Sequence, residues 1–289
     1  MKYFYYPGCS AETSAIPYDM STREVARALD INLEELEDWN CCGATSYISL
    51  KDILACAVTA RNLALAEKAG GGDIVAICNA CYLGLKKSDK LMREYEDCYE
   101  KINKALSAGG LKYNCTVNVR HFLEVLVNDI GLEKIREKVT NPLTNITVAC
   151  YTGCQLSRPY GEIDNEEFPE MMEKLMSAIG ARIAHFPLKG KCCGGMLMST
   201  APDVALKLNR NILLCAEEND ADCISTCCPL CQMNLEGYQG VINRKFNTRF
   251  NMPVLYFTQM VGVALGISSK KLGIPKNLVN CRQVLAKVG

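Results

Sequence analysis

The sequence predicts an α/β fold made of two homologous domains related by an internal duplication. A pattern of five cysteines occurs twice with nearly equal spacing: a Gly-Cys, an adjacent pair followed by glycine, and a CxxC. Short apolar runs alternate with longer amphipathic segments around each copy, as strands alternate with helices. Repeats of this length indicate duplication of a whole domain. Asn and Pro interrupt the pattern in residues 138–145, which places the domains at residues 1–142 and 143–289.

Each predicted domain begins with a short buried strand that ends at its Gly-Cys loop. These strands are residues 2–6 and 146–150. Two longer segments, residues 47–70 and 201–220, have the period of amphipathic helices. The first ends in a glycine run suited to a C-cap, and Pro202 suits the first turn of the second.

A second apolar run precedes each CxxC. Residues 73–78 and 222–227 are predicted as strands, and the CxxC then opens the following helix. Further along, the segments around Phe122 and Phe257 also resemble each other. The cysteines of both copies therefore fall in loops after strands or at helix starts, where sites are usually built.

Composition excludes several classes of function. The formal net charge of the 289 residues is zero, which gives no electrostatic case for nucleic acid or for an anionic membrane surface. The N-terminus has no basic segment followed by an apolar one, so we expect no secretory signal and a cytoplasmic location. The most apolar run, residues 253–268, contains Gln259 and is shorter than the roughly 20 residues of a spanning helix. We predict a buried core helix there and no direct membrane insertion.

The chain has 18 cysteines. In a secreted domain this number would indicate a disulfide framework. A chain of this size can form a hydrophobic core without disulfide bonds. Clusters of the CC and CxxC type suit a metal or redox centre better. A strongly reducing cytoplasm would suit so many thiols.

Each copy supplies five thiols, one more than a structural zinc site or a cubane iron–sulfur cluster needs. The extra thiol could bridge two irons in a cluster that is not a simple cube, stay free as a redox thiol, or belong to the core. The ten thiols are Cys9, Cys41, Cys42, Cys78 and Cys81 in the first copy, and Cys154, Cys192, Cys193, Cys228 and Cys231 in the second.

The glycine after each cysteine pair has a physical reason. Both thiolates can reach one centre only if the backbone leaves a regular strand, in which neighbouring side chains point to opposite faces. Gly43 and Gly194 tolerate positive φ, and their N–H groups can approach sulfur closely. Such donors offset the negative charge of several thiolates. Lys189 and Lys191 flank the second pair and either help to offset this charge or are solvated surface charges.

The other eight cysteines are expected to be structural. Cys150 and Cys227 stand where the other repeat has Tyr5 and Ile77, and are predicted to be buried small hydrophobes. The remaining six have no repeat partner and are predicted to be core or surface residues. They are Cys56, Cys98, Cys115, Cys215, Cys223 and Cys281.

The motifs YPGC…CCG…CNAC and YTGC…CCG…CPLC resemble the two cysteine-rich CCG domains of the B subunit of heterodisulfide reductase. The resemblance covers nearly the entire chain, and both copies have all five cysteines. It implies a fold of two homologous CCG-type α/β domains. No segment resembles the C-x2-C-x2-C-x3-C-P run of a cubane ferredoxin.

This resemblance implies the cofactors, reaction and partners. Each CCG domain would bind a non-cubane 4Fe–4S cluster through its five cysteines. The substrate would be the mixed disulfide of coenzyme M and coenzyme B in methanogenesis, reduced to the two thiols by one-electron steps. Homolytic cleavage with each sulfur at one iron needs no protein nucleophile. The partners would be the ferredoxin-like C subunit of heterodisulfide reductase and its flavin-bearing A subunit, with a hydrogenase or formate dehydrogenase module as a further candidate.

Residues near the second pair are candidates for a substrate pocket. His185 could supply protons, although a histidine held by hydrogen bonds in the fold is the plainer interpretation. Lys189 and Lys191 could hold anionic groups, and Met196 could line the pocket. Arg61 and Arg210 are also candidates, since Arg suits oxyanions.

Two rival interpretations stay open. In the first, the chain is a CCG-type electron-transfer module of another oxidoreductase complex, and its clusters conduct without binding substrate. In the second, one of the sites holds zinc as a structural ion.

Overall fold

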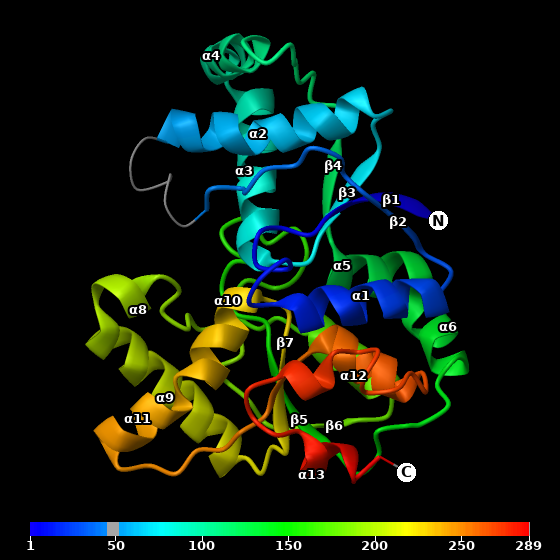
Figure 1. Cartoon of the computed structure of the whole chain (residues 1–289), viewed down its shortest axis with the longest axis vertical. Helices are drawn as coiled ribbons and strands as arrows, with labels where there is room; N and C mark the ends of the chain where they lie inside the picture. Colours follow the sequence, from blue (N-terminus) through cyan, green and yellow to red (C-terminus); the bar gives the residue numbers. More distant parts are fainter. Residues whose placement is uncertain (45–51, 289) are drawn as a thin grey trace. The chain divides into compact units, whose positions relative to one another are not determined.

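Two four-stranded sheets organise the computed structural model, which describes residues 1–44 and 52–288 (Figure 1). Their strand orders are β2-β1-β3-β4 and β6-β5-β7-β8, and all the strand pairings are parallel. The strands are β1 Lys2–Tyr6, β2 Asn32–Glu35, β3 Asp73–Ala76, β4 Asn118–His121, β5 Thr147–Tyr151, β6 Arg182–Ile183, β7 Cys223–Thr226 and β8 Val254–Tyr256. The repeated order confirms the predicted α/β fold with a duplicated domain.

Helices follow the strands in each half. In the first half they are α1 Ile16–Ala28, α2 Asp52–Lys68, α3 Asn79–Glu94, α4 Glu96–Ser107, α5 Phe122–Glu124, the π-helix η1 Val125–Gly131 and α6 Leu132–Glu137. In the second half they are α7 Met171–Ala178, α8 Leu197–Thr200, α9 Pro202–Glu218, α10 Pro229–Gln232, the π-helix η2 Met233–Gly237, α11 Gln239–Phe246, α12 Phe257–Ala264, the 3-10 helix η3 Ile274–Lys276 and α13 Arg282–Leu285.

The chain divides into two compact units that differ from the two sequence halves. The first unit comprises residues 1–13 and 30–122, and the second comprises residues 14–29 and 123–289. Helix α1 therefore belongs to the second unit, although it follows the first strand. The predicted boundary between residues 142 and 143 separates the two copies of the repeated sequence, not the two compact units, and it stays a prediction.

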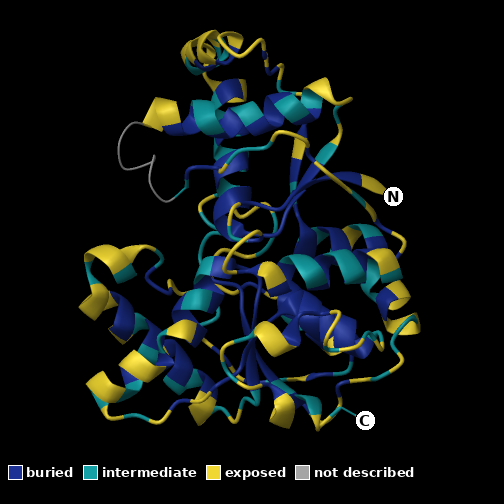
Figure 2. Cartoon of the chain, viewed as in Figure 1, coloured by how far each residue is buried: buried dark blue, intermediate teal, exposed yellow. Residues whose placement is uncertain are grey.

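The first unit is built around β1 and β3. Four of the five β1 residues are buried, and Tyr5 and Tyr6 are completely so. Helices α2 and α3 pack against each other, and α2 also packs against α4. Figure 2 shows α4 as largely exposed; only Ile102 and Leu106 of this helix are buried. Helix α3 also packs on β3 and β4, so the core of this unit lies between the sheet and α3, with α2 packed on α3.

In the second unit, helices from the two halves of the sequence pack on each other. Helix α1 packs on α12, where the rings of Tyr18 and Tyr256 stack with centroids 4.1 Å apart. The hydroxyls of Ser21 and Thr258 lie 2.6 Å apart in the same contact. Helix α7 packs on α6. The helix after the first strand of each half thus packs on the helix that follows the last strand of the other half.

Most predicted elements are found near their expected positions. The strand at residues 2–6 agrees with β1, and the one at residues 146–150 begins and ends one residue later. Helix α9 begins at Pro202, as its sequence predicts. Helix α2 is described from Asp52, and residues 47–51 of the predicted helix lie outside the described residues. The glycine run after α2 ends the helix as expected, since Gly71 N–H donates to Ala66 O.

The expectation of one core helix at residues 253–268 is wrong in part. The run begins as strand β8 and becomes helix α12 at Phe257, in the same way that β4 passes into α5 at Phe122. All eight residues of α12 are buried, as predicted for this run. Burial between strand and helix layers makes both parts uniformly apolar, so hydropathy alone did not separate them. Within residues 1–44 and 52–288, every helix is too short or too polar to span a bilayer.

Candidate functional site

The cysteines of each half gather at the carboxyl ends of the central strands of its sheet. Cys9 follows β1, and Cys154 follows β5. Cys78 and Cys228 follow β3 and β7 and are the N-cap residues of α3 and α10. Because neighbouring strands are parallel, their carboxyl ends meet at one edge, where ligands of open α/β sheets bind. The positive end of the helix dipole also favours thiolates at these N-caps.

The five cysteines of the first half form a continuous group of sulfurs. The Sγ atoms of Cys9 and Cys41 lie 3.6 Å apart, and those of Cys42 and Cys81 lie 3.5 Å apart. Cys78 makes a hydrogen bond with Cys81. Hydrogen bonds from Cys41 and then from Cys81 lower the pKa of Cys42 to about 3. Thiolates are the form that binds metal.

The second half repeats this arrangement. The Sγ atoms of Cys193 and Cys231 lie 3.5 Å apart. Cys154 makes a hydrogen bond with Cys192, and Cys228 makes one with Cys231. The hydrogen bond from Cys154 lowers the pKa of Cys192 to about 6, and the one from Cys231 lowers the pKa of Cys193. The structure thus brings the ten predicted residues together in two groups of five, while their role as ligands stays a prediction.

The glycines after the cysteine pairs have the predicted conformation. Gly43 and Gly194 have φ values of 71° and 90°. Their N–H groups lie 3.5 Å from the Sγ of Cys41 and 3.3 Å from the Sγ of Cys192. Gly195 adds an N–H 3.4 Å from the Sγ of Cys193. These donors stabilise negative charge on the sulfurs.

A buried tyrosine fixes each cysteine pair, a role that was not predicted from the sequence. Tyr6 ends β1 and donates its hydroxyl to Asn40 O at 2.7 Å. Tyr151 ends β5 and donates to Lys191 O at 2.7 Å. The two carbonyls belong to the residue before each pair. Burial, with nearby cysteine thiolates, raises the pKa of both phenols, so they stay protonated donors. The motifs YPGC and YTGC contained this signal, since both begin with the tyrosine.

A helix behind each pair supplies a second anchor. Thr59 of α2 donates to Cys42 O at 2.7 Å, and Asn209 of α9 donates to Cys193 O at 2.8 Å. Both side chains are buried and stand at equal distances in sequence before their CxxC. The sequence did not predict them, because a hydroxyl and an amide do not align by residue type.

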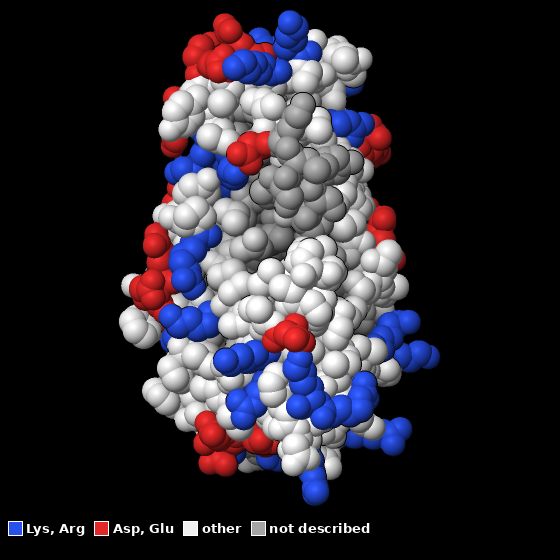
Figure 3. Space-filling model, turned by 90° about the vertical axis from the view of Figure 1, so that its left-hand side faces the viewer, with Lys and Arg blue, Asp and Glu red and all other residues white. Residues whose placement is uncertain are grey.

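The substrate-pocket candidates have different surroundings. Lys189 forms an ion pair with Glu173 at 2.8 Å. Lys191, His185 and Met196 are exposed. The interpretation of Lys189 as a free solvated charge is therefore wrong, while the pocket roles of all four stay predictions. The face in Figure 3 carries Lys, Arg, Asp and Glu between wider uncharged areas.

Arg61 supports the loop that leads to the first cysteine pair. Its guanidinium donates to Asp38 O and to Asn40 Oδ1, and also pairs with the Asp38 carboxylate. These contacts give Arg61 a structural role.

The other eight cysteines are not joined in disulfides, and neither are the ten cysteines of the two groups. Cys150 and Cys227 are buried, as predicted. Cys56, Cys223 and Cys281 are also buried, and Cys98, Cys115 and Cys215 are partly exposed. Burial raises the pKa of Cys150, Cys223 and Cys281, so these thiols are neutral core residues.

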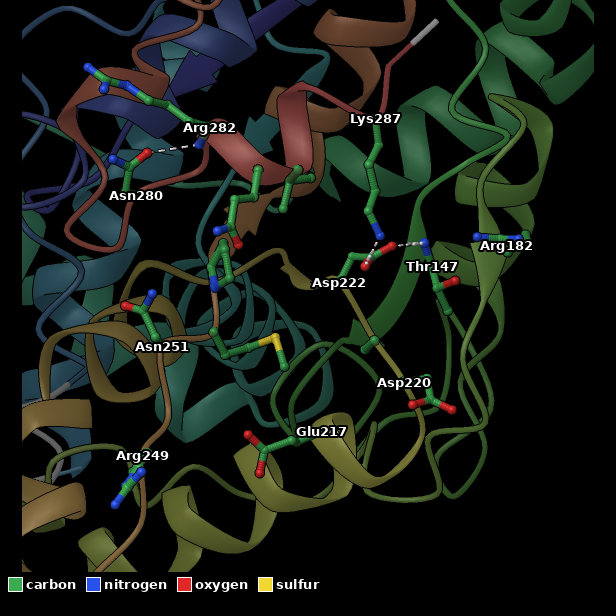
Figure 4. Close-up of a pocket in the computed structure, with 15 residues that line it drawn as sticks. Thr147, Arg182, Glu217, Asp220, Asp222, Arg249, Asn251, Asn280, Arg282 and Lys287 are labelled. Carbon is green, nitrogen blue, oxygen red and sulfur yellow. Dashed lines mark hydrogen bonds and ion pairs between the residues drawn. The ribbon is translucent and has the colours of Figure 1, made fainter.

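A cavity of about 1050 Å³ lies away from the cysteines (Figure 4). It is lined by Thr147 at the start of β5, Arg182 at the start of β6 and Asp222 just before β7. These are the amino ends of the strands, whereas the cysteines follow the carboxyl ends. Asp222 is held there by Lys287 and by Thr147 N–H, as the dashed lines of Figure 4 show. This cavity therefore belongs to the opposite end of the sheet from the cysteine group.

Comparison with known proteins identifies the family. Residues 3–86 and 148–236 match the family described as CCG, cysteine-rich domain. The B subunit of the ferredoxin:CoB–CoM heterodisulfide reductase of Methanosarcina mazei is 30% identical over 97% of this chain and 95% of its own. A protein of Archaeoglobus profundus, named as similar to the B subunit of heterodisulfide reductase, is 33% identical over 94% of this chain and 93% of its own. The chain belongs to the CCG family, within the group of heterodisulfide reductase B subunits.

A further relative and a solved structure are also similar to this chain. The 8-methylmenaquinol:fumarate reductase membrane anchor subunit of Wolinella succinogenes is 33% identical over 98% of this chain and 99% of its own. A crystal structure of a hypothetical protein from Helicobacter pylori has a TM-score of 0.77 and 13% identity, covering 96% of this chain and 52% of that one. This second likeness shows the fold alone.

The residues of this CCG chain fit an iron–sulfur group. Each half offers five neighbouring thiols, and thiolates are the ligands of such clusters. Within residues 1–44 and 52–288, no three Cys, His, Asp or Glu side chains are arranged to hold a single metal ion, whereas hydrogen bonds between sulfurs join the cysteines within each group. Gly8 leaves the space beside Cys81 open, because a Cβ there would lie 2.9 Å from the Cys81 Sγ.

Proposed function

We propose that the chain is the disulfide-reducing subunit of an oxidoreductase complex, where it acts on the mixed disulfide of coenzyme M and coenzyme B. The observation that carries the proposal is the pair of equivalent five-cysteine groups, one on each sheet. Two equivalent sites suit a reaction that needs two electrons. Reduction consumes two electrons and two protons, and converts one disulfide into two thiols.

The chain's own residues would hold a non-cubane 4Fe–4S cluster in each half. When bound, each cluster would supply a one-electron carrier. The ten cysteines would be the ligands, and Gly43, Gly194 and Gly195 would direct N–H groups at the sulfurs. Tyr6 and Tyr151 would keep the cysteine pairs in place through the preceding carbonyls. A structural zinc ion at one of the sites is the alternative occupant.

The proposal includes partner proteins and a location. Relatives are named as subunits of heterodisulfide reductases, so we expect a ferredoxin-like partner and a flavoprotein partner to deliver the electrons. We place the reaction in the cytoplasm, because a reducing compartment suits a chain with 18 cysteines.

Turnover by purified protein tests the proposal. The chain, loaded with iron and sulfide under anaerobic conditions, should oxidise a reduced dye when the mixed disulfide is added and release two thiols per disulfide. Cys42→Ser and Cys193→Ser should each abolish turnover. Cys98→Ser is the matched control and should retain it, because Cys98 is partly exposed and outside both groups. Iron-loaded wild-type protein that releases no thiol would contradict the proposal.

A second candidate function is electron transfer without substrate binding. The Wolinella relative, named as a subunit of a fumarate reductase, favours it. In that case the iron-loaded chain would exchange electrons with redox partners at the same rate with and without the mixed disulfide.

A further inference from the structure

The two cysteine groups differ in the polar side chains that surround them, and this inference rests on the proposed function. In the first half, the hydrogen bonds to the sulfurs of the cysteine group within residues 1–44 and 52–288 come from other cysteines and from backbone N–H groups such as that of Gly43. In the second half, an amide is added, and a guanidinium contacts the loop before the pair, where the first half has Arg61 paired with the Asp38 carboxylate. The difference concerns Asn234 and Arg158.

Asn234 donates into the second cysteine pair from η2. Its side chain is 2% exposed. Its Nδ2 lies 3.0 Å from Gly195 O, 3.4 Å from Cys193 O and 3.5 Å from the Cys193 Sγ. A distance of 3.5 Å suits a hydrogen bond to sulfur, which is larger than oxygen. One amide thus both fixes the CCG loop and donates toward a candidate ligand.

The first half has no side chain at the corresponding position. Asn234 stands three residues after Cys231, and Gly84 stands three residues after Cys81. The sulfur pairs beside them are otherwise alike, since both have Sγ atoms 3.5 Å apart. The amide of Asn234 is therefore an addition to a shared geometry.

Arg158 adds a positive charge to the same half. It stands four residues after Cys154, and its guanidinium donates to Gly190 O in the loop that leads to the second pair. Among the described residues, its buried Nε has no hydrogen-bond partner. Gly190 stands two residues before Cys192, so the charge of Arg158 lies in the loop that holds this cysteine. The corresponding residue of the first half is the neutral Thr13, which bonds to Cys9 O.

Both additions act in the same direction on a redox centre. Reduction adds negative charge to a cluster and its thiolates. Hydrogen-bond donors to sulfur and nearby cations stabilise this charge, and hydrogen bonds to the sulfurs are a known determinant of cluster potentials. A site with more of them is reduced at a higher potential.

We propose that Asn234 and Arg158 make the second-half site the first to be reduced, so that a one-electron donor fills the two sites in a fixed order. The first electron enters the second-half site and the next enters the first-half site. The two electrons, with two protons, then match the needs of one disulfide. Asn234 and Arg158 are positioning residues that act through the cysteines.

Reductive titration of the iron-loaded chain tests the order. Titanium(III) citrate would be added anaerobically, and reduction followed by electron paramagnetic resonance and visible absorption. The double variants Cys42→Ser/Cys81→Ser and Cys193→Ser/Cys231→Ser each leave one complete site and assign the two potentials. We expect the higher potential in the chain that retains the second-half site. Equal potentials, or the reverse order, would overturn the proposal.

Variants of the donors test the cause. Asn234→Leu keeps the volume but removes the donor, and should reduce the equilibrium constant for reduction of the second-half site about tenfold, about 59 mV for one electron. Arg158→Gln should act in the same direction. Gly84→Asn should raise the first-half potential, and its Cβ fits because Cys42 Cβ and Thr59 Cγ2 would both be 3.8 Å away.

The controls separate this inference from the proposed function. Asn219→Leu is the matched control, because Asn219 bonds to Cys215 O outside both groups, and it should leave both potentials unchanged. If Asn234→Leu retains iron and shifts neither potential, the inference is wrong. If that variant loses iron, the reduction potentials of the Gly84→Asn and Arg158→Gln variants test the inference instead. Wild-type protein that binds no iron would refute the proposed function itself, whereas iron-loaded protein with unshifted potentials refutes only the tuning.

Discussion

At the scale of single residues, Gly8 is constrained both by its backbone conformation and by a cysteine of the first group. Its φ is +76°, and an added Cβ would lie 2.9 Å from the Cys81 Sγ. Gly8→Ala should therefore displace Cys81 and disturb the first group of sulfurs. We expect the variant to lose about half of the bound iron, since the second group is untouched. Iron analysis after anaerobic reconstitution measures this.

A second glycine separates the steric clash from backbone strain. Gly110 also has positive φ, +67°, but nothing lies within 4 Å of its Cβ position. Gly110→Ala should cost about 1 kcal/mol of stability for the left-handed conformation and keep all of the iron. Equal iron loss in both variants would show that strain, and not the contact with Cys81, is responsible.

The residues of the site were predictable to the extent that they repeat. The duplicated pattern identified the ten cysteines, and the CCG motif identified Gly43 and Gly194. Tyr6 and Tyr151 repeat as well, but their role depends on a carbonyl more than thirty residues away. Asn234 has glycine as its counterpart, so no internal comparison could find it.

At the scale of elements, the packing of α1 on α12 supports the second unit. Tyr18 is completely buried, stacks on Tyr256 and donates to Cys227 O at 3.2 Å. Tyr18→Ala should lower the free energy of unfolding by about 3–5 kcal/mol, as for other buried aromatic residues. Tyr95→Ala is the control, because Tyr95 is 55% exposed and should cost little. Denaturant unfolding that finds equal losses would argue against the α1–α12 contact.

Helix η2 also carries a buried carboxyl that makes stability depend on pH. Burial raises the pKa of Glu236 to about 6. A raised pKa in the folded state stabilises the fold below the ordinary value of 4.5, and this contribution is lost as pH rises through about 6. The free energy of unfolding should fall by about 2 kcal/mol across this interval. Glu236→Gln should lack this fall, and identical pH profiles for the two proteins would contradict the assignment.

Local sequence pattern predicted the helices and strands themselves, but not which of them pack on each other. Strands of uniform burial and amphipathic helices were visible in hydropathy and in glycine and proline positions, as in α2 and α9. The pairing of α1 with α12 joins segments more than two hundred residues apart. Local pattern contains no information about such a contact. The prediction combined β8 and α12 in one helix because both segments are buried on all sides and are therefore uniformly apolar.

At the scale of the whole molecule, duplication supplies two sites and divergence makes them different. The two sheets share one strand order, and each half places five cysteines at the same end of its strands. The same plan has Asn234 and Arg158 in one half, and Gly84 and Thr13 in the other, so the two cysteine groups have different polar neighbours.

Iron and acid-labile sulfide content tests the central claim, that each half holds its own four-iron cluster, most directly. Anaerobically purified protein should contain about eight irons per chain with matching sulfide, and about four in each double cysteine variant that removes one site. One zinc with about four irons in the wild-type chain, or complete loss of iron when either half alone is altered, would contradict it.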